Sequence, residues 1–337
     1  MQISMDDKYQ SLNEMQKRAV FQTEGPVLIL AGAGSGKTRV LTHLIAYLIE
    51  EMQVPSYYIL AITFTNKAAH EMRERVDRLI GEAASDVWIS TFHSCCLRIL
   101  RRHGKRIGYE SGFTVYDPED QKAVMRRILK NMNLNEKMWT PRTVLAAISG
   151  AKNDLIGPDD YHRAARGDYA KEMIAQLYAE YEKELLRNQA MDFDDILGKC
   201  VQLFAMNPDI LEKYQDQFRY IMVDEYQDTN TAQYQLIHQL SGMFGNICVV
   251  GDDDQSIYKF RGANIRNILD FEKDFPDAAV IRLEENYRST KNILHAANEV
   301  ILHNQGRKSK TLWTQNETGE KITLYQADTE GEEAGYI

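Results

Sequence analysis

The stretch VLILAGAGSGKT at residues 27–38 decides the fold. Its first four residues are apolar and predict a short buried strand, and apolar residues then recur at helical spacing from Val40 to Leu48. The glycine-rich loop between them, Ala31 to Thr38, matches the phosphate-binding loop pattern, except that Ala31 stands at its strict first position. Such a loop presents backbone N–H groups to a phosphate at a helix N-terminus. The alternative is a plain glycine-rich turn, and the flanking strand and helix argue against it.

A second motif, VDEYQD at residues 223–228, follows the apolar run at 220–223. A protein with a phosphate-binding loop needs an acid at a strand end to hold Mg²⁺, and Asp224 stands there. Glu225, next to it, can orient and deprotonate an attacking water. Alone, this motif could be a solvated acidic turn. Together with the phosphate-binding loop, it predicts hydrolysis of a nucleoside triphosphate.

The order of apolar runs predicts an α/β fold with a parallel sheet and helices on both faces. Strand-like runs stand at 27–30, 58–64, 87–91, 220–223, 246–250 and 279–283, and a helix is expected at about 66–80. Between 118 and 188 glycine is sparse and β-branched runs vanish, which predicts an inserted helical subdomain with helices at 119–131, 141–149 and 170–187. The tail from residue 319 is expected to hold one strand and then an acidic end.

Composition excludes several classes of protein. The 337 residues are 44% hydrophobic and 26% charged, which is ordinary globular usage and excludes wholesale disorder. No stretch reaches the ~18 apolar residues of a membrane helix, and the N-terminus lacks the features of a signal peptide, so we expect no membrane partner. The four cysteines form no C-x-x-C pair, which favours reduced, mostly buried thiols in a cytoplasmic protein.

The net charge of −9 argues against a protein dominated by one basic face. Charge is nevertheless segregated between residues 94 and 108, where no Asp or Glu occurs. The basic residues of this segment are Arg98, Arg101, Arg102, Lys105 and Arg106. The segment is either a solvated helix face or a patch that contacts nucleic acid, and the sequence leaves both open.

Eight motifs in order extend the pattern: LNEMQ, AGAGSGKT, ITFTNKAA, STFHS, MDFDD, VDEYQDTN, VVGDDDQSIYKFRGA and LEENYRST. They resemble superfamily 1 DNA helicases of the UvrD/PcrA/Rep group, over about residues 12–290. The resemblance implies a RecA-like P-loop NTPase sheet with an inserted all-helical subdomain, and ATP and Mg²⁺ as cofactors. It also implies single-stranded DNA and single-strand/duplex junctions as partners, with repair or replication proteins as further candidates.

On the nucleotide side, the resemblance assigns roles to matching positions. Gln16 looks like the adenine-reading glutamine, and Tyr287 like the adenine-stacking aromatic with Arg39 on the other face. Taken alone, Gln16 would be interpreted as a solvated helix glutamine, and Gln255 as an amide that caps a loop. The resemblance instead implies that Gln255 is the γ-phosphate sensor. The predicted catalytic residues are Lys37, Glu225, Gln255 and Arg288, and the metal ligands are Thr38 and Asp224. The predicted nucleotide-binding residues are Gln16, Ala31, Gly32, Ala33, Gly34, Ser35, Gly36, Lys37, Thr38, Arg39 and Tyr287.

On the DNA side, the resemblance points to aromatic side chains with polar neighbours. Stacking on such rings is worth roughly 1–3 kcal/mol per base. An isolated aromatic is more often a core residue, but the polar residues at 65–66 and 259–261 reverse that preference. Phe260 stands where many relatives carry Trp, so its stacking area is smaller here. The predicted DNA-binding residues are Phe64, Thr65, Asn66, His93, Phe193, Tyr258, Phe260 and Arg261.

We expect three parts: a first RecA-like motor domain at 1–112 and 191–280, the helical subdomain at 113–190, and the start of a second RecA-like domain at 281–337. The family's second arginine finger and its QGxxxE-like helix are not found before Ile337, so we expect an N-terminal portion with slow turnover. The activity implied for the parent protein is that of an ATP-dependent 3′–5′ DNA helicase acting in DNA repair or replication. Two alternatives remain: a module that binds ATP and single-stranded DNA without unwinding, and a helicase–nuclease subunit.

Overall fold

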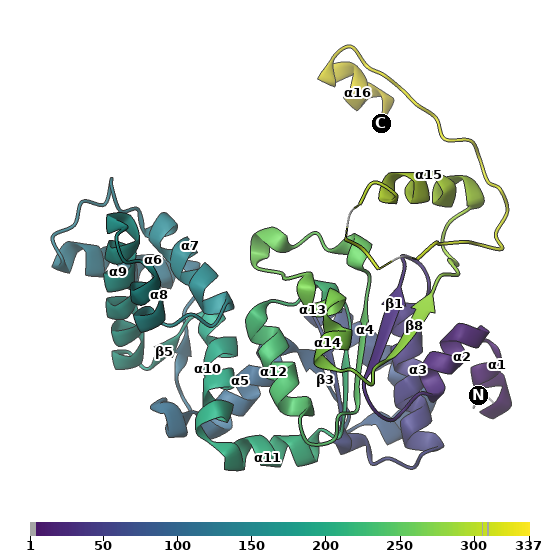
Figure 1. Ribbon diagram of the computed structural model, residues 1–337, viewed down its shortest axis with the longest axis horizontal. Helices are drawn as coiled ribbons and strands as arrows, with labels where there is room; N and C mark the ends of the chain where they lie inside the picture. Colours follow the sequence, from purple (N-terminus) through teal and green to yellow (C-terminus); the bar gives the residue numbers. More distant parts are fainter. Residues whose placement is uncertain (1–4, 305, 309) are drawn as a thin grey trace.

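A six-stranded parallel sheet forms the centre of the molecule (Figure 1), in the order β3-β2-β6-β7-β1-β8. The structure is a computed structural model that describes residues 5–304, 306–308 and 310–337. The strands are β1 (Val27–Ala31), β2 (Ile59–Thr63), β3 (Trp88–Thr91), β6 (Tyr220–Val223), β7 (Ile247–Gly251) and β8 (Ala279–Leu283). Because β1 lies between β7 and β8, the loop after β1 opens at the centre of one sheet edge. The predicted fold class is confirmed.

Helices cover both faces of this sheet because successive strand residues point to opposite sides. Leu28 and Leu30 pack into a core with α5 (Phe92–His103), α10 (Phe193–Met206) and α12 (Thr231–Ser241). Val27 and Ile29 pack into the opposite core with α2 (Glu14–Phe21), α3 (Lys37–Glu50) and α4 (Asn66–Ile80). Both faces of the strands are therefore buried, as in other doubly covered parallel sheets.

Four helices form a separate body beside the sheet (Figure 1). They are α6 (Pro118–Asn131), α7 (Pro141–Asn153), α8 (Pro158–Ala164) and α9 (Tyr169–Arg187). They enclose their own core, which includes Met125, Leu129, Leu177 and Leu185. Where the chain enters and leaves this body, β4 (Thr114–Val115) pairs with β5 (Ala190–Met191). The sequence pattern did not predict α8, a helix of seven residues that is too short for a clear apolar period.

A buried ionic network joins the helical body to the sheet domain. Lys152 Nζ of α7 lies 2.7 Å from Asp192 Oδ2, 2.8 Å from Asp195 Oδ1 and 2.7 Å from Glu182 Oε1. Asp192 and Asp195 also form the capping box at the start of α10. Burial raises the pKa of Asp195 to about 7. Breaking such a buried network by removing one partner costs about 3–5 kcal/mol, so it fixes where the helical body attaches.

The remaining helices lie outside the helical body (Figure 1). They are α1 (Met5–Gln10), α11 (Pro208–Gln217), α13 (Arg266–Leu269), α14 (Phe271–Asp274), α15 (Lys291–Ile301) and α16 (Glu330–Tyr336). None of the described helices combines the length and the apolar content needed to cross a membrane. All four cysteines are buried and unbridged, which confirms the expected thiol state.

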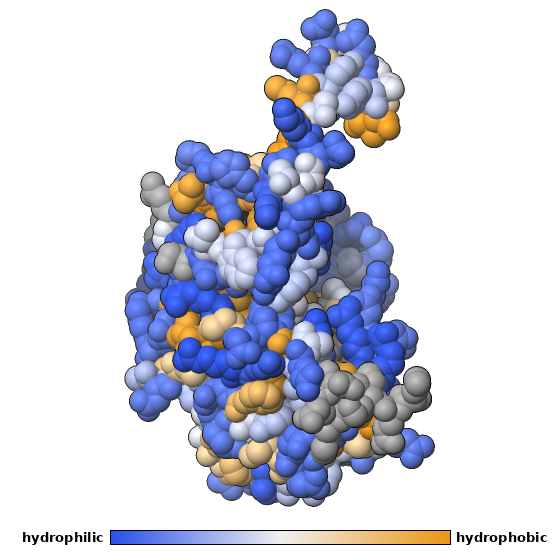
Figure 2. All heavy atoms as spheres, turned by 90° about the vertical axis from the view of Figure 1, so that its right-hand side faces the viewer, coloured by the Kyte–Doolittle hydropathy of each residue, from blue (hydrophilic) through white to orange (hydrophobic). Residues whose placement is uncertain are grey.

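The C-terminal region corrects one expectation. The strand expected after residue 319 is absent from the described chain there, which runs irregularly to α16 and stands away from the main body (Figures 1 and 2). Ile322 and Leu324 are 63% and 92% exposed, because no neighbouring strand offers them a ladder to join. The domain boundary expected between residues 280 and 281 falls inside β8, which pairs with β1 over its whole length.

The basic segment is largely engaged within the fold. The guanidinium groups of Arg98 and Arg101 each lie 4.0 Å from the centroid of an aromatic ring. Arg106 Nη2 pairs with Asp209 Oδ1 at 2.9 Å. These contacts support the interpretation as a packed and solvated helix face.

Candidate active site

The phosphate-binding loop runs from the end of β1 to Lys37, where α3 begins. Gly34 and Gly36 have φ values of +68° and +87°, in the left-handed region that favours glycine. Neighbouring side chains press on both: a Cβ would lie 2.8 Å from Asn286 Nδ2 at Gly34, and 2.8 Å from Gln16 Nε2 at Gly36. Backbone conformation and packing therefore both require glycine here.

Two pairs of polar side chains meet where β1 and β6 end. Lys37 Nζ lies 2.8 Å from Glu225 Oε2, and Thr38 Oγ1 donates to Asp224 Oδ2 at 3.3 Å. Glu225 has a φ of +52°, a left-handed conformation that costs a non-glycine residue roughly 1–2 kcal/mol. Strain of this kind is concentrated at functional sites, which supports a chemical role for Glu225.

The electrostatics of this cluster favour a cation. Burial raises the pKa of Asp224 to about 6, and the charge of Glu225 adds to the rise. The same two causes raise the pKa of Asp228 to about 6. The hydroxyl of Thr38 and the carboxylate of Asp224 are hard oxygen donors of the kind that Mg²⁺ prefers. The donor set therefore fits the predicted metal.

The segment after β8 packs directly on the phosphate-binding loop. Tyr287 N donates to Gly34 O at 3.0 Å, and Asn286 Nδ2 donates to Ala33 O at 2.6 Å. Arg288 follows these residues and is exposed. The structure thus brings two predicted nucleotide residues, Tyr287 and Arg288, to the loop.

Gln16 lies beneath the phosphate-binding loop. Its side chain is fully buried; Nε2 donates to Ser35 O at 2.9 Å, and Oε1 accepts from Asn13 N at 3.1 Å. In this structure Gln16 therefore holds the phosphate-binding loop against the start of α2. Arg39 lies nearby, because its Nη2 donates to Ser11 Oγ at 2.7 Å in the turn that precedes α2.

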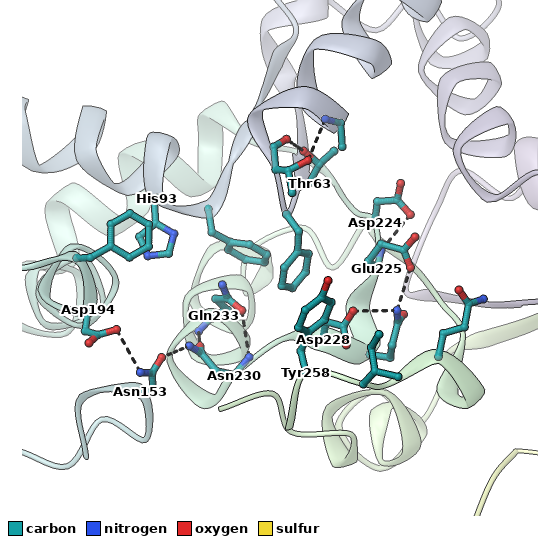
Figure 3. A pocket seen from close by; sticks show the side chains of 18 of the residues that line it. Thr63, His93, Asn153, Asp194, Asp224, Glu225, Asp228, Asn230, Gln233 and Tyr258 are labelled. Carbon is teal, nitrogen blue, oxygen red and sulfur yellow. Dashed lines mark hydrogen bonds between the residues drawn. The ribbon is translucent and has the colours of Figure 1, made fainter. Parts of the chain in front are cut away.

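A cavity of about 920 Å³ runs from this cluster toward the predicted DNA-binding aromatics (Figure 3). From the nucleotide side it is lined by Thr38, Asp224, Glu225 and Gln255, and from the DNA side by Phe64, Thr65, His93, Phe193 and Tyr258. Asn66 and Phe260 are not among the described residues that line it. The side chain of Arg261 lies outside the described part of the chain.

His93 and Phe193 form a stacked pair at the cavity wall (Figure 3), with ring centroids 3.7 Å apart and planes 18° from parallel. Burial lowers the pKa of His93 to about 4, so the imidazole is neutral at neutral pH. Phe193 is half exposed although its partner is not. This pair gives the cavity wall a flat, uncharged surface.

Two residues that sequence reasoning gave no role connect the parts of the site. Gln227 is buried; its Oε1 accepts from Asp252 N at 2.9 Å, and its Nε2 donates to Glu225 Oε2 at 2.9 Å. Asn153 of α7 donates to Asp194 Oδ1 at 3.2 Å and accepts from Asn230 Nδ2. Gln227 stands inside the quoted VDEYQD motif, whereas no local pattern marks Asn153 because its partners are distant in sequence.

Comparisons with known proteins identify the family of this chain. Residues 12–276 match the family model described as the UvrD/REP helicase N-terminal domain, and residues 281–337 match the UvrD-like helicase C-terminal domain. The chain is 56% identical to the ATP-dependent DNA helicase PcrA of Staphylococcus epidermidis, over 99% of this chain and 46% of that protein. It is 57% identical to the protein of the same name from Staphylococcus aureus, over 97% of this chain and 44% of that protein. The chain spans less than half the length of these relatives. It belongs to the UvrD/REP helicase family.

Proposed function

We propose that the chain is the ATP-binding motor portion of an ATP-dependent DNA helicase. In this proposal it couples ATP hydrolysis to 3′–5′ translocation on single-stranded DNA and to duplex unwinding, in DNA repair or replication. The single observation that carries the proposal is the cavity lined by both Glu225 and Tyr258. A change at either group alters the surroundings of the other, which supports coupling between hydrolysis and strand binding.

On the nucleotide side, we assign the phosphates of ATP to Lys37 and Arg288. Lys37 ends the phosphate-binding loop, and a cation there supplies charge to the β- and γ-phosphates. Thr38 and Asp224 would hold Mg²⁺, which when bound neutralises phosphate charge. Glu225 would orient the attacking water and accept its proton. Gln255, whose amide donates to Asp252 Oδ2 beside the cavity, would respond to the γ-phosphate.

On the adenine side, Tyr287 and Arg39 would flank the base. Tyr287 is 46% exposed, and its hydroxyl accepts from Asn13 Nδ2 at 2.7 Å, which fixes its ring beside the loop. The Gln16 amide is buried, and it is bonded to Ser35 O through Nε2 and to Asn13 N through Oε1. We therefore propose that Gln16 acts on nucleotide binding through the loop that it holds.

On the DNA side, we propose that a single strand crosses the cavity wall formed by Phe64, His93 and Tyr258. Sequence-tolerant stacking suits a motor that must move along any sequence. Thr65 caps α4 with its side chain, so its hydroxyl is shared between the helix and any strand. Phe260 is 79% exposed and could meet the strand beyond the cavity. The four reduced, buried thiols suit the cytoplasm, the compartment that we propose.

The alternative function is a module that binds ATP and single-stranded DNA without unwinding. The exposed position of Arg288, which carries no ion pair among the described contacts of its side chain, favours this for residues 1–337 alone. The test is a strand-displacement and ATPase assay on residues 1–337, alone and linked to the C-terminal half of a curated relative, with Lys37→Ala as the contamination control. Unwinding that appears only in the linked protein, and disappears with Lys37→Ala, supports the motor. Tight binding of both ligands without unwinding in either form supports the module.

A further inference from the structure

Three consecutive carboxylates at the end of β7 share one ammonium group. Lys310 Nζ lies 2.8 Å from Asp252 Oδ1, 2.5 Å from Asp253 Oδ1 and 2.7 Å from Asp254 Oδ2. The side chain of Lys310 is 1% exposed, and those of the three aspartates are 3%, 0% and 9% exposed. The cluster is therefore an almost completely buried ionic centre.

Such a centre depends strongly on its cation. Three carboxylate oxygens, one from each aspartate, lie within 4.8 Å of one another. Without a cation they would repel each other in a medium that screens charge poorly. Arg307 pairs with Asp254 Oδ2 at 2.9 Å, but Lys310 alone contacts all three aspartates among the ion pairs of the described chain. Its removal would leave the turn at 252–255 without the group that joins all three carboxylates.

The turn that Lys310 holds carries the predicted γ-phosphate sensor. Asp252 Oδ2 accepts a hydrogen bond from Gln255 Nε2, and Asp252 N donates to Gln227 Oε1 at 2.9 Å. Gln227 Nε2 in turn donates to Glu225 Oε2 at 2.9 Å, and Glu225 pairs with Lys37. An unbroken chain of polar contacts thus runs from Lys310 to the phosphate-binding loop.

Lys310 belongs to the C-terminal region of the chain, whereas the three aspartates follow β7 of the sheet domain. It follows α15 in the region that matches the C-terminal family domain. Its neighbour Leu312 packs on the phosphate-binding loop so closely that a Cβ on Gly32 would lie 2.1 Å from Leu312 Cδ2. Trp313 N donates to Glu284 O at 3.0 Å, which ties the same stretch to the end of β8. Any shift of this stretch against the sheet would move the ammonium relative to the turn.

We infer that Lys310 is a positioning residue for Gln255: its ammonium fixes the Asp252–Asp254 turn so that the Gln255 amide faces the cavity. This inference rests on the proposed function, because Gln255 matters only if the site binds a nucleoside triphosphate. Lys310 touches neither nucleotide nor DNA in this account. It links the C-terminal region to the part of the site that distinguishes a triphosphate from a diphosphate.

The test compares affinities for ATPγS and ADP, each with Mg²⁺, in the full chain of residues 1–337. Lys310→Met should lower the ratio of the two affinities about 2–10-fold, the value of roughly one hydrogen bond, and leave ADP affinity unchanged. Lys310→Arg, which keeps the charge, should restore part of the ratio. The matched control is Lys308→Met, because Lys308 pairs with the more exposed Glu272 and should leave the ratio unchanged.

A second variant covers loss of folding. Lys310→Met combined with Asp253→Asn removes one charge of each sign, and should fold and show the same reduced ratio. The inference is overturned if the wild type prefers ATPγS and both variants keep its ratio, or if the wild type binds both nucleotides equally well. A wild-type chain that binds neither nucleotide refutes the proposed function itself.

Discussion

The ammonium of Lys37 and the carboxylate of Glu225 form an ion pair, with 2.8 Å between Nζ and Oε2. The group that should hold phosphate thus already holds the group that should activate water. A bound γ-phosphate competes with Glu225 for Lys37, so nucleotide binding would release the base at the moment when it is needed. Such an exchange would couple the phosphate-binding loop to the end of β6.

Glu225→Gln tests the exchange. The neutral amide of the variant cannot form an ion pair with Lys37, so Lys37 is free to bind phosphate. ATP should therefore bind as tightly as in the wild type or more tightly, with a gain in binding free energy of up to ~1 kcal/mol for this partly exposed pair. Turnover should fall about 10²–10⁴-fold because the general base is lost. Nucleotide titration and steady-state hydrolysis, in the linked protein described above, measure the two effects. Near-wild-type turnover would remove Glu225 from the role of base.

Asp224→Asn should stabilise the nucleotide-free protein at alkaline pH. The pKa of Asp224 is raised to about 6, so ionising this carboxyl destabilises the folded protein. The destabilisation is absent below about pH 4 and is complete once the pH has risen through 6. At pH 8 the variant should gain about 1–3 kcal/mol in the free energy of unfolding and lose the Mg²⁺ dependence of ATP binding. Denaturant unfolding at pH 4 and pH 8 checks this; an equal effect at both values would contradict it.

Phe64→Ala and Tyr258→Ala should each weaken single-stranded DNA binding by roughly 1–3 kcal/mol with little base preference. Both rings line the cavity. The matched control is Tyr57→Ala, an aromatic residue that is 49% exposed but precedes β2 instead of following it. Fluorescence anisotropy with oligo(dT) at several salt concentrations measures the effect, and affinity should fall as salt rises. Equal losses in the control and the cavity variants would argue against this groove.

His93→Phe should make the free energy of unfolding depend less on pH between pH 4 and 7. Burial lowers the pKa of His93 to about 4, below its ordinary 6.5. Between these two pH values the imidazole is protonated in the unfolded state and neutral in the folded state. His93 therefore contributes stability above pH 6.5 that is lost as the pH falls toward 4, by up to about 3 kcal/mol. The variant keeps a ring against Phe193 and should lack this loss. Parallel stability curves for the two proteins between pH 4 and 7 would disprove the prediction.

Much of the fold could be predicted because the strands are short apolar runs that end at glycines or acids, as in VLILAGAG and YIMVDE. The expected strand near Ile322 failed because apolar alternation does not supply a neighbouring strand, and Leu324 is exposed. The nucleotide cluster could be predicted because Lys37 and Glu225 lie in ordered motifs. The contacts of Gln16 with Ser35 and Asn13 could not be predicted, because a helix glutamine carries no local signal for the partner that its amide takes.

Other parts of the site could not be predicted, because they depend on contacts between distant segments. Lys310 and Asp252 are 58 residues apart, counting 310 − 252, and no local period links them. Asn153 and Asn230 meet only once the helical body has attached through Lys152. Their roles follow from the attachment of whole bodies, which hydrophobic patterning does not encode.

The proposed function depends above all on Lys37 binding the phosphates of ATP. The most direct measurement is equilibrium binding of ATPγS with Mg²⁺ to residues 1–337, comparing the wild type with Lys37→Ala and with the control Lys17→Ala, whose side chain pairs with the exposed Glu14. We expect the wild type and the control to bind alike and Lys37→Ala to bind at least about tenfold more weakly, because a charge-assisted contact is worth ~1.5–3 kcal/mol. Equal affinity of the wild type and Lys37→Ala would contradict this expectation.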